Sequence, residues 1–119
     1  MSLYEVLALL RASDGIELAA VATTDGLLVE SAVRQHDDAE AICAVAANGL
    51  ALAEAIGREV HKGGAVQALL QYDEGLVLIE PLSQEAMLLL VADGSDRIGR
   101  LRFLVHKHQA ALVQALEAI

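Results

Sequence analysis

The side chains that could carry chemistry are few, and their spacing does not bring them together. Cys43 is the only cysteine and lies in an aliphatic stretch, whereas a reactive thiolate needs an accessible, electropositive site. His106 and His108 are two residues apart in an expected helix and point to nearly opposite sides, whereas helical zinc pairs take positions i and i+4. His36 and His61 lie at opposite ends of another expected helix, too far apart to share one ion. The spacing predicts no metal site, and Cys43 is expected to be a small core or interface residue.

Carboxylates and glycines form no catalytic arrangement either. Asp25 is explained as a turn residue, and Asp37 or Asp38 as the cap of a helix. The glycine pair at 63–64 follows Lys62, but the lysine-serine or lysine-threonine ending of a phosphate-binding loop is missing, and no helix is expected after it. No Ser-His-Asp arrangement is readable. We therefore expect a protein that is not an enzyme, with no catalytic residue and no cofactor. If a nucleotide is involved, it is bound to a partner.

Composition limits the partners. The chain of 119 residues has 17 acidic and 8 basic residues and a net charge of −9, whereas nucleic acids and anionic membrane surfaces favour clustered Lys and Arg. No apolar run reaches the ~18 residues of a membrane span, and the opening stretch MSLYEVLALLRAS has Glu5 where a signal peptide needs positive charge. The lone cysteine suits a reducing compartment. We expect a cytoplasmic protein that neither binds nucleic acid nor inserts directly into a membrane.

The apolar spacing predicts one domain over residues 1–119, in the order helix, two strands, helix, three strands, helix. The expected bounds are 3–12 for the first helix, 16–22 and 27–33 for the first two strands, about 39–61 for the long helix, and 65–72, 75–80 and 86–92 for the last three strands. The last helix has an apolar side from Ile98 to Leu116, and Asp96 can cap it. Asp25-Gly26 is a strong hairpin signal.

The strands are expected to form a sheet that is covered on both faces. Short turns between successive strands make them antiparallel. An antiparallel strand with one wet face alternates apolar and polar residues, whereas LVLI and MLLLVA are apolar on both faces. Three helices are available to cover the sheet, which predicts a helix–sheet–helix sandwich of the α/β class, α+β type.

The long helix has almost no polar face. At about 100° per residue, one wide aliphatic side is expected to lie on the sheet: Ile42, Val45, Ala46, Gly49, Leu52, Ala53, Ile56 and Val60. One flank has Cys43, Ala47, Leu50 and Glu54, and the outward side has Ala44, Asn48, Ala51, Ala55 and Arg58. The small outward side chains would let a second protein chain come close, although alanine also simply favours helix.

Strand 65–72 supports the hypothesis of a second chain. It follows the long helix and is expected at an edge of the sheet, where an uncovered apolar strand is a liability unless it pairs. Pairing with a symmetry mate would extend the sheet in a self-complementary two-fold contact. The residues expected in this homodimer interface are Cys43, Ala47, Leu50, Ala51, Glu54, Val66, Ala68 and Leu70. A further partner is expected to dock on Ala44, Asn48, Ala55 and Arg58.

Three segments together suggest a known family. GIELAAVATTDGLLVES (15–31) runs from one strand through Asp-Gly into the next. GREVHKGGAVQALLQYDEGLVLIEPL (57–82) is a helix end, a Gly-Gly break and a hairpin. RIGRLRF (97–103) contains Gly99 and Arg102 in a Gly-x-x-Arg pattern. In order and spacing, from about residue 3 to 117, the chain resembles the roadblock family, which includes a dynein light chain and the bacterial mutual gliding protein B; in these domains Gly-x-x-Arg is common where the last helix starts.

The resemblance implies a profilin-like roadblock fold, in which a five-stranded antiparallel sheet has the long helix on one face and the N- and C-terminal helices on the other. It also implies a homodimer through the long helix and the third strand. Members of the family bind small Ras-like GTPases and regulate them as activators or scaffolds, and others are adaptors in motor or membrane-signalling complexes. In the mutual gliding protein B branch, activation proceeds without an inserted arginine finger.

Two classes of function stay open. The first is a non-catalytic, homodimeric bacterial regulator or scaffold that binds a small Ras-like GTPase and modulates its GTPase activity or localisation. The second is a small-molecule-sensing module, or an adaptor with no GTPase partner. A sensing pocket needs a few convergent polar groups, and the expected core offers little beyond Gln67, Gln71 and His108.

Overall fold

The computed structural model of the chain describes residues 1–34, 37–94 and 98–119. Its elements are, in chain order, α1 (Leu3–Ala12), β1 (Ile16–Thr23), β2 (Leu28–Val33), α2 (Ala39–Glu59), β3 (Ala68–Tyr72), β4 (Gly75–Pro81), β5 (Ala86–Asp93) and α3 (Ile98–Glu117). Their order and types confirm the prediction. His36, the expected cap Asp96, and Arg97 of the RIGRLRF segment lie outside the described residues.

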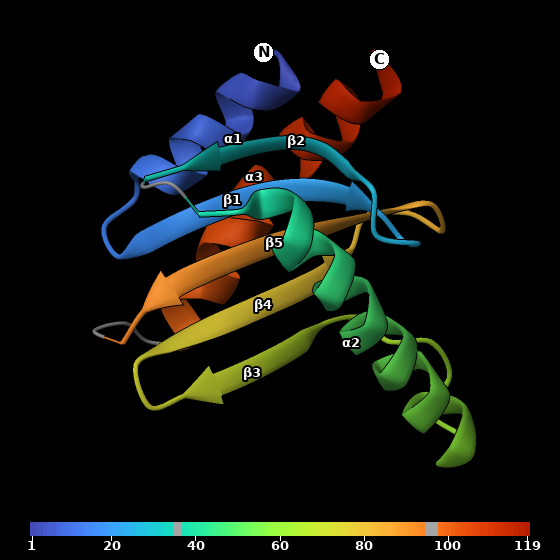
Figure 1. The fold of residues 1–119 in the computed structure, drawn as a ribbon. Coiled ribbons are helices and arrows are strands. Elements are labelled where there is room, and N and C mark those ends of the chain that lie inside the picture. The colour runs from blue at the N-terminus through green and yellow to red at the C-terminus, as the bar shows by residue number, and fades with distance from the viewer. Residues whose placement is uncertain (35–36, 95–97) are drawn as a thin grey trace.

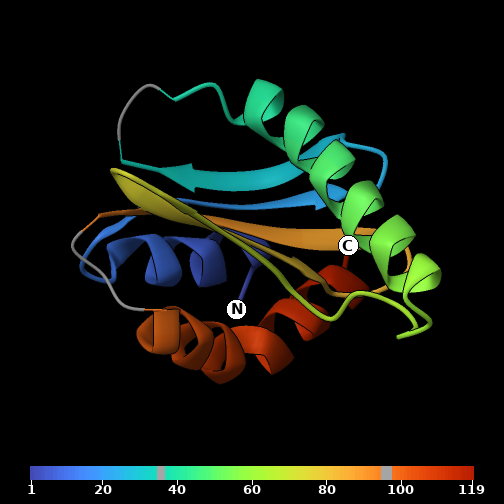
Figure 2. The same ribbon diagram turned by 90° about the horizontal axis from the view of Figure 1, so that it is seen from below.

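The five strands form one antiparallel sheet in the order β2-β1-β5-β4-β3, so β2 and β3 are its edges. The central strands β1 and β5 pair from Ile16 opposite Ala92 to Thr23 opposite Ala86. Figure 1 shows α2 crossing one face of the sheet, and Figure 2 shows α1 and α3 together on the other face. The structure thereby confirms the predicted sandwich and the edge position of β3.

The central strands bury side chains on both faces, because each face has its own apolar layer. Under α1 and α3, Leu88 and Leu90 of β5 belong to a core that also contains Leu101 of α3. Under α2, Met87 and Leu89 of the same strand belong to a second core. Successive side chains of a strand point to opposite faces. An apolar run such as MLLLVA is therefore what a strand between two cores requires.

Local capping sets where the first two helices begin. The Ser2 hydroxyl accepts a hydrogen bond from the Glu5 amide (3.1 Å), and the Glu5 carboxylate accepts one from the Ser2 amide (3.0 Å). These two bonds form a capping box. At the start of α2 the Asp38 carboxylate accepts a hydrogen bond from the Ala41 amide (3.1 Å). Of the two caps expected for this helix, Asp38 is therefore the one that satisfies a free amide.

The segment between α2 and β3 differs from the prediction. α2 ends before His61, and positive φ angles at His61 (59°) and Gly63 (84°) turn the chain back. The Ala65 amide then donates a hydrogen bond to the Glu54 carboxylate of α2 (3.2 Å). This bond ties the segment to the helix, and β3 starts at Ala68 instead of 65. The contact joins residues 11 apart in the sequence, so the local pattern did not reveal it.

Candidate protein-interaction surface

α2 packs on the sheet through its small-residue side. The residues of α2 that are buried within the chain are Ala39, Cys43, Ala46, Ala47 and Leu50. They share a core with Ala20 and Ala22 of β1, and small side chains on both elements allow the helix to lie close to the strand. The turn before β2 also lies close to α2, because a Cβ atom on Gly26 would be 3.1 Å from the Cα atom of Ala44.

The predicted orientation of α2 is therefore wrong. Of the eight residues expected to face the sheet, only Ala46 is buried. The large members of that set are exposed, by 69% for Val45, 63% for Leu52, 54% for Ile56 and 52% for Val60. Conversely Cys43, Ala47 and Leu50, expected in the homodimer interface, are buried in the chain's own core. Both sides of α2 are apolar, and periodicity alone does not decide which apolar side packs inward.

An open apolar groove lies between the uncovered side of α2 and the β3 edge of the sheet. Its volume is about 580 Å³, and its lining includes Val45, Asn48 and Leu52 of α2 and Leu70 and Tyr72 of β3. The groove follows α2 from Ala41 to Leu52. Figure 1 shows that α2 runs diagonally across the sheet and that its C-terminal half extends beyond it. Asn48 and the Tyr72 hydroxyl add the few polar groups to a lining that is otherwise apolar.

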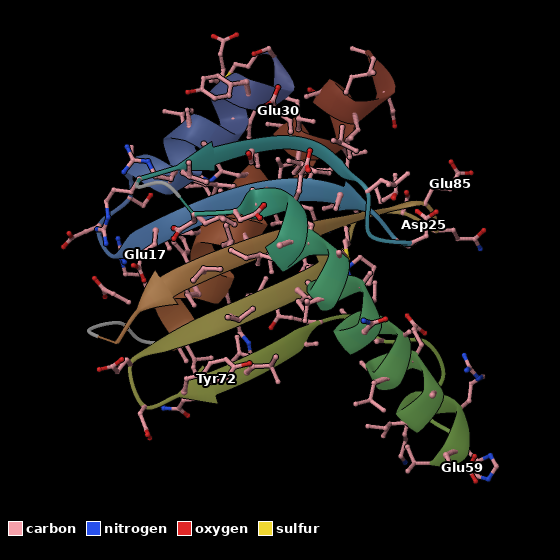
Figure 3. All side chains as sticks on the ribbon, in the orientation of Figure 1. Glu17, Asp25, Glu30, Glu59, Tyr72 and Glu85 are labelled. Atoms are coloured by element: carbon pink, nitrogen blue, oxygen red, sulfur yellow. The ribbon has the colours of Figure 1, made fainter. Side chains whose placement is uncertain are left out.

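β3 contributes an open strand edge to this groove. It has five residues, and β4 is its only neighbour among the described strands. Leu70 (42%) and Tyr72 (56%) are exposed, as is Val66 (81%) before the strand; Figure 3 shows Tyr72 near the end of β3. Unpaired backbone groups on an edge strand can accept another strand. The groove and the edge together form a candidate interaction surface.

The remaining predicted contact residues lie on or beside this surface. Ala44, Asn48, Ala51, Ala55 and Arg58 are exposed on α2, and Glu54 and Ala68 are half-buried. The apolar spacing predicted that Val45, Leu52 and Ile56 lie on the sheet, and Tyr72 was not among the predicted contact residues. One feature of the sequence could have indicated these exposed residues: α2 has more apolar residues around its circumference than one sheet can cover.

Of the side chains that could carry chemistry, Cys43 is buried and His108 is bonded within the fold, whereas His61 and His106 are exposed. Burial raises the pKa of the Cys43 thiol, which favours the neutral form over the reactive thiolate. His108 Nδ1 is 2.9 Å from the Leu104 carbonyl oxygen. Gln71 is exposed, whereas the Gln67 side chain donates to the Glu80 carboxylate, so these polar groups do not converge on one core cavity. Within residues 1–34, 37–94 and 98–119, no three His, Cys, Asp or Glu side chains are placed to hold a metal ion.

α2 also has the length and composition of a membrane-spanning helix, and it is the one such helix in the described part of the chain. This corrects the expectation that no apolar segment is long enough. Only 28% of its most apolar window is buried within the chain. A single helix of this kind is a weak sign of a membrane protein, because a helix covered by protein on several sides has the same composition.

Comparison with solved structures identifies the fold. The chain matches Myxococcus xanthus MglB with a TM-score of 0.87 and 14% identity over 98% of this chain and 96% of that one. A Roadblock/LC7 domain from Streptomyces avermitilis gives 0.82 and 19% over 99% and 97% of the two chains. The gliding protein MglB from Thermus thermophilus gives 0.87 and 16% over 98% and 90%. No curated protein matches by sequence.

A family match covers most of the chain as well. The family described as Roadblock/LC7 domain matches residues 3–92, which extend from the start of α1 into the end of β5. The match therefore includes α2, β3 and the groove between them. Together with the shared fold, it shows that the chain belongs to the Roadblock/LC7 domain family.

Proposed function

We propose that the protein is a non-catalytic homodimer that binds a small Ras-like GTPase and changes its rate of GTP hydrolysis or its localisation. The observation that carries the proposal is the apolar groove between α2 and β3, which is open to a second copy. The resemblance of the sequence to roadblock proteins suggests the class of the further partner. One structural neighbour is described as MglB with a tetrameric arrangement, which supports self-association for a chain of this fold.

The second copy would cover the large side chains that the fold leaves exposed. Val45 and Leu52 of α2 and Leu70 and Tyr72 of β3 lie on the two sides of one groove. Ile56 is also exposed, about one turn farther along α2. Burying a large aliphatic side chain fully is worth about 1.5–3 kcal/mol. A two-fold contact uses the same patch on both copies, so each of these residues contributes twice.

The GTPase would bind the ridge of α2 that the second copy leaves free. Ala44, Ala55 and Arg58 are exposed there, and the alanines allow another backbone to come close. Asn48 lies at the border, because it also lines the groove. The sequence contains no phosphate-binding loop, so the nucleotide would be held by the GTPase.

GTP hydrolysis by a small Ras-like GTPase of the same organism tests this proposal. We expect the dimer to bind that GTPase and to change its hydrolysis rate or its location in the cell. Ala55→Arg should abolish binding without dissociating the dimer, because it places a large side chain on the ridge. Ala110→Arg, at an exposed alanine of α3 on the other face, is the matched control and should bind normally. Absence of binding in both the GTP and GDP states would contradict the proposal and leave the adaptor alternative.

A further inference from the structure

A polar network lies on the face of β3 opposite the groove, where α3 passes the start of the strand. Gln67 donates from Nε2 to the Glu80 carboxylate (2.9 Å), and its Oε1 accepts a hydrogen bond from Nε of Arg102 (2.9 Å). Glu80 is only 8% exposed, and it is the one charged side chain buried to this extent in the described chain. The two bonds fix the Gln67 amide and hold the Arg102 guanidinium beside the start of β3.

The Arg102 guanidinium keeps unused hydrogen-bonding capacity. It is exposed and borders an open cavity of about 550 Å³ that Gln67 and His106 also line. Among the described residues the ion pair found is Arg34 with Glu17 (3.4 Å), and Arg102 is bonded only to Gln67. A planar guanidinium matches the geometry of a carboxylate. Glu80 also lines the cavity, but its carboxylate already accepts the hydrogen bond from Gln67. The Arg102 side of the cavity therefore suits a carboxylate supplied by another chain.

The far end of β3 offers such carboxylates. Asp73 and Glu74 form the turn between Tyr72 and Gly75, which are paired across the hairpin. Both acidic side chains are exposed, and within the described ranges neither has an ion pair. Figure 1 shows this turn at the end of β3 away from the segment that joins it to α2.

The pairing of β3 with β4 determines which backbone groups face outward. In a two-residue hairpin the flanking residues, here Tyr72 and Gly75, exchange hydrogen bonds. Hydrogen-bonded and non-hydrogen-bonded pairs then alternate along the ladder, so Leu70 and Ala68 also direct their backbone groups toward β4. The outward backbone groups belong to the residues between them: Gln67, Leu69, Gln71 and Asp73.

A two-fold axis at Leu70 would pair these outward groups along the whole strand. It is the register in which the five residues of β3 overlap completely with those of a second copy. Leu70 then lies opposite the partner's Leu70, and Gln67 lies opposite the partner's Asp73. Directly opposite residues of antiparallel strands project to the same face. Since Gln67 reaches α3, the partner's Asp73 would project toward Arg102.

Building on the proposed homodimer, we propose that the partner's β3–β4 turn docks at this cavity and that the partner's Asp73 carboxylate pairs with Arg102. The two-fold axis repeats the contact, so each dimer contains it twice. Each chain has a net charge of −9, and two such chains repel one another. The contact between Arg102 and the partner's Asp73 instead places opposite charges next to each other where the two β3 strands pair. Ion pairs at such an interface fix the register and the choice of partner more than they add affinity.

Charge reversal tests the pairing in the intact chain. Arg102→Glu and Asp73→Arg should each raise the dimer Kd by about tenfold, because each replaces two attractions with two repulsions. The double variant should return to within about threefold of the parent. Sedimentation velocity over a concentration series at low salt measures Kd, and far-ultraviolet circular dichroism checks that each variant is folded.

Two control variants make the same charge changes elsewhere. Lys107→Glu is on the exposed side of α3, and Glu85→Arg is in the turn between β4 and β5. Figure 3 shows Glu85 far from Tyr72. Both controls should leave the Kd within about twofold of the parent, as expected for isolated surface charges.

A single cysteine measures the register directly. In Leu70→Cys the new thiol should lie opposite its own copy, in a non-hydrogen-bonded pair that is close enough for a disulfide. Mild oxidation should therefore yield a covalent dimer. Gln71→Cys is the matched control, because that thiol would lie opposite the partner's Leu69 and should stay unlinked. The parent chain sets the baseline, since its Cys43 is buried.

The outcomes separate this inference from the proposed function. Silent charge reversals, a double variant that is no better than the single ones, or a dimeric sample in which Leu70→Cys fails to cross-link would each overturn the inference and leave the homodimer standing. Cross-linking of Gln71→Cys in place of Leu70→Cys would do the same. A parent chain that sediments as a monomer would instead remove the homodimer, and the inference would fall with it.

Discussion

At the scale of residues, side-chain size decides what each part of α2 contacts. Cys43, Ala46 and Ala47 lie on the sheet, where alanines of β1 leave room for a close helix. Val45 and Leu52, on nearly the opposite side of the same helix, are mostly exposed. Close packing in a protein interior favours the arrangement that leaves no voids. The larger aliphatic residues therefore remain available for contact with a second chain.

Truncation of one leucine of α2 tests this division. Leu50 is 5% exposed, so Leu50→Ala should lower the free energy of unfolding by about 2–5 kcal/mol, through lost apolar burial and a cavity. Leu9→Ala on α1, where the side chain is 48% exposed, should cost less than about 1 kcal/mol. Urea denaturation at one protein concentration measures both. Equal losses at the two positions would contradict the orientation of α2.

The cysteine of α2 gives a pH-dependent test of the same packing. Burial raises the pKa of the Cys43 thiol above its ordinary value of 9.0. The neutral thiol therefore stabilises the folded state fully below that unfolded-state value, and the contribution is lost as the pH rises through the folded-state pKa. We expect the difference in unfolding free energy between the parent and Cys43→Ala to shrink above about pH 9. Urea denaturation of both chains in a pH series measures it, and a difference that stays constant would argue against a buried thiol.

At the scale of elements, the segment between α2 and β3 holds the two walls of the groove in their relative positions. The Glu54 carboxylate accepts a hydrogen bond from the Ala65 amide, and the Gly57 carbonyl accepts one from the Lys62 amide (2.8 Å). These two bonds fold the segment back along the last turns of α2. The start of β3 is thereby held beside α2, so that the helix and the strand border the same groove.

A glycine in α2 reports on this folded-back segment. A Cβ atom on Gly57 would lie 2.4 Å from the Gly63 carbonyl oxygen, so Gly57→Ala should lower the free energy of unfolding by about 1–3 kcal/mol through overpacking. Gly99→Ala in α3 is the control, because nothing lies within 4 Å of the added atom. The control should be neutral or stabilising by up to about 1 kcal/mol, since alanine favours helix. Thermal unfolding measures both variants, and a stabilised Gly57→Ala would show that the segment takes another path.

Local chemistry explains which elements could be predicted from the sequence. The Asp25-Gly26 turn, the Asp38 cap and the apolar run of β5 each depend on residues close together in the chain, and each is found where expected. The side of α2 that faces the sheet could not be predicted, because it depends on alanines of β1 that are distant in sequence. The start of β3 was missed for the same reason, since the Glu54–Ala65 bond is a tertiary contact. The predicted contact residues therefore lie on or beside the two elements that border the groove, but Cys43, Ala47 and Leu50 among them are buried in the chain's own core.

At the scale of the whole molecule, one side of the fold leaves large apolar side chains of both α2 and β3 exposed next to each other. α2 extends past the sheet there, and β3 ends the sheet there with a free edge (Figures 1 and 2). The other face of the sheet is covered by α1 and α3, which complete their own core. A single chain leaves the apolar side chains and the strand edge on this side exposed, whereas a second copy related by a two-fold axis would cover them.

Sedimentation equilibrium at micromolar concentration tests this account most directly. The parent chain should have twice the 12.5 kDa mass of one chain, and Leu52→Asp should have the single mass because it places a charge in the covered groove. Leu9→Asp, the same change at an exposed leucine of α1, should stay dimeric. A parent chain with the single mass, or a Leu52→Asp variant as dimeric as Leu9→Asp, would contradict the account.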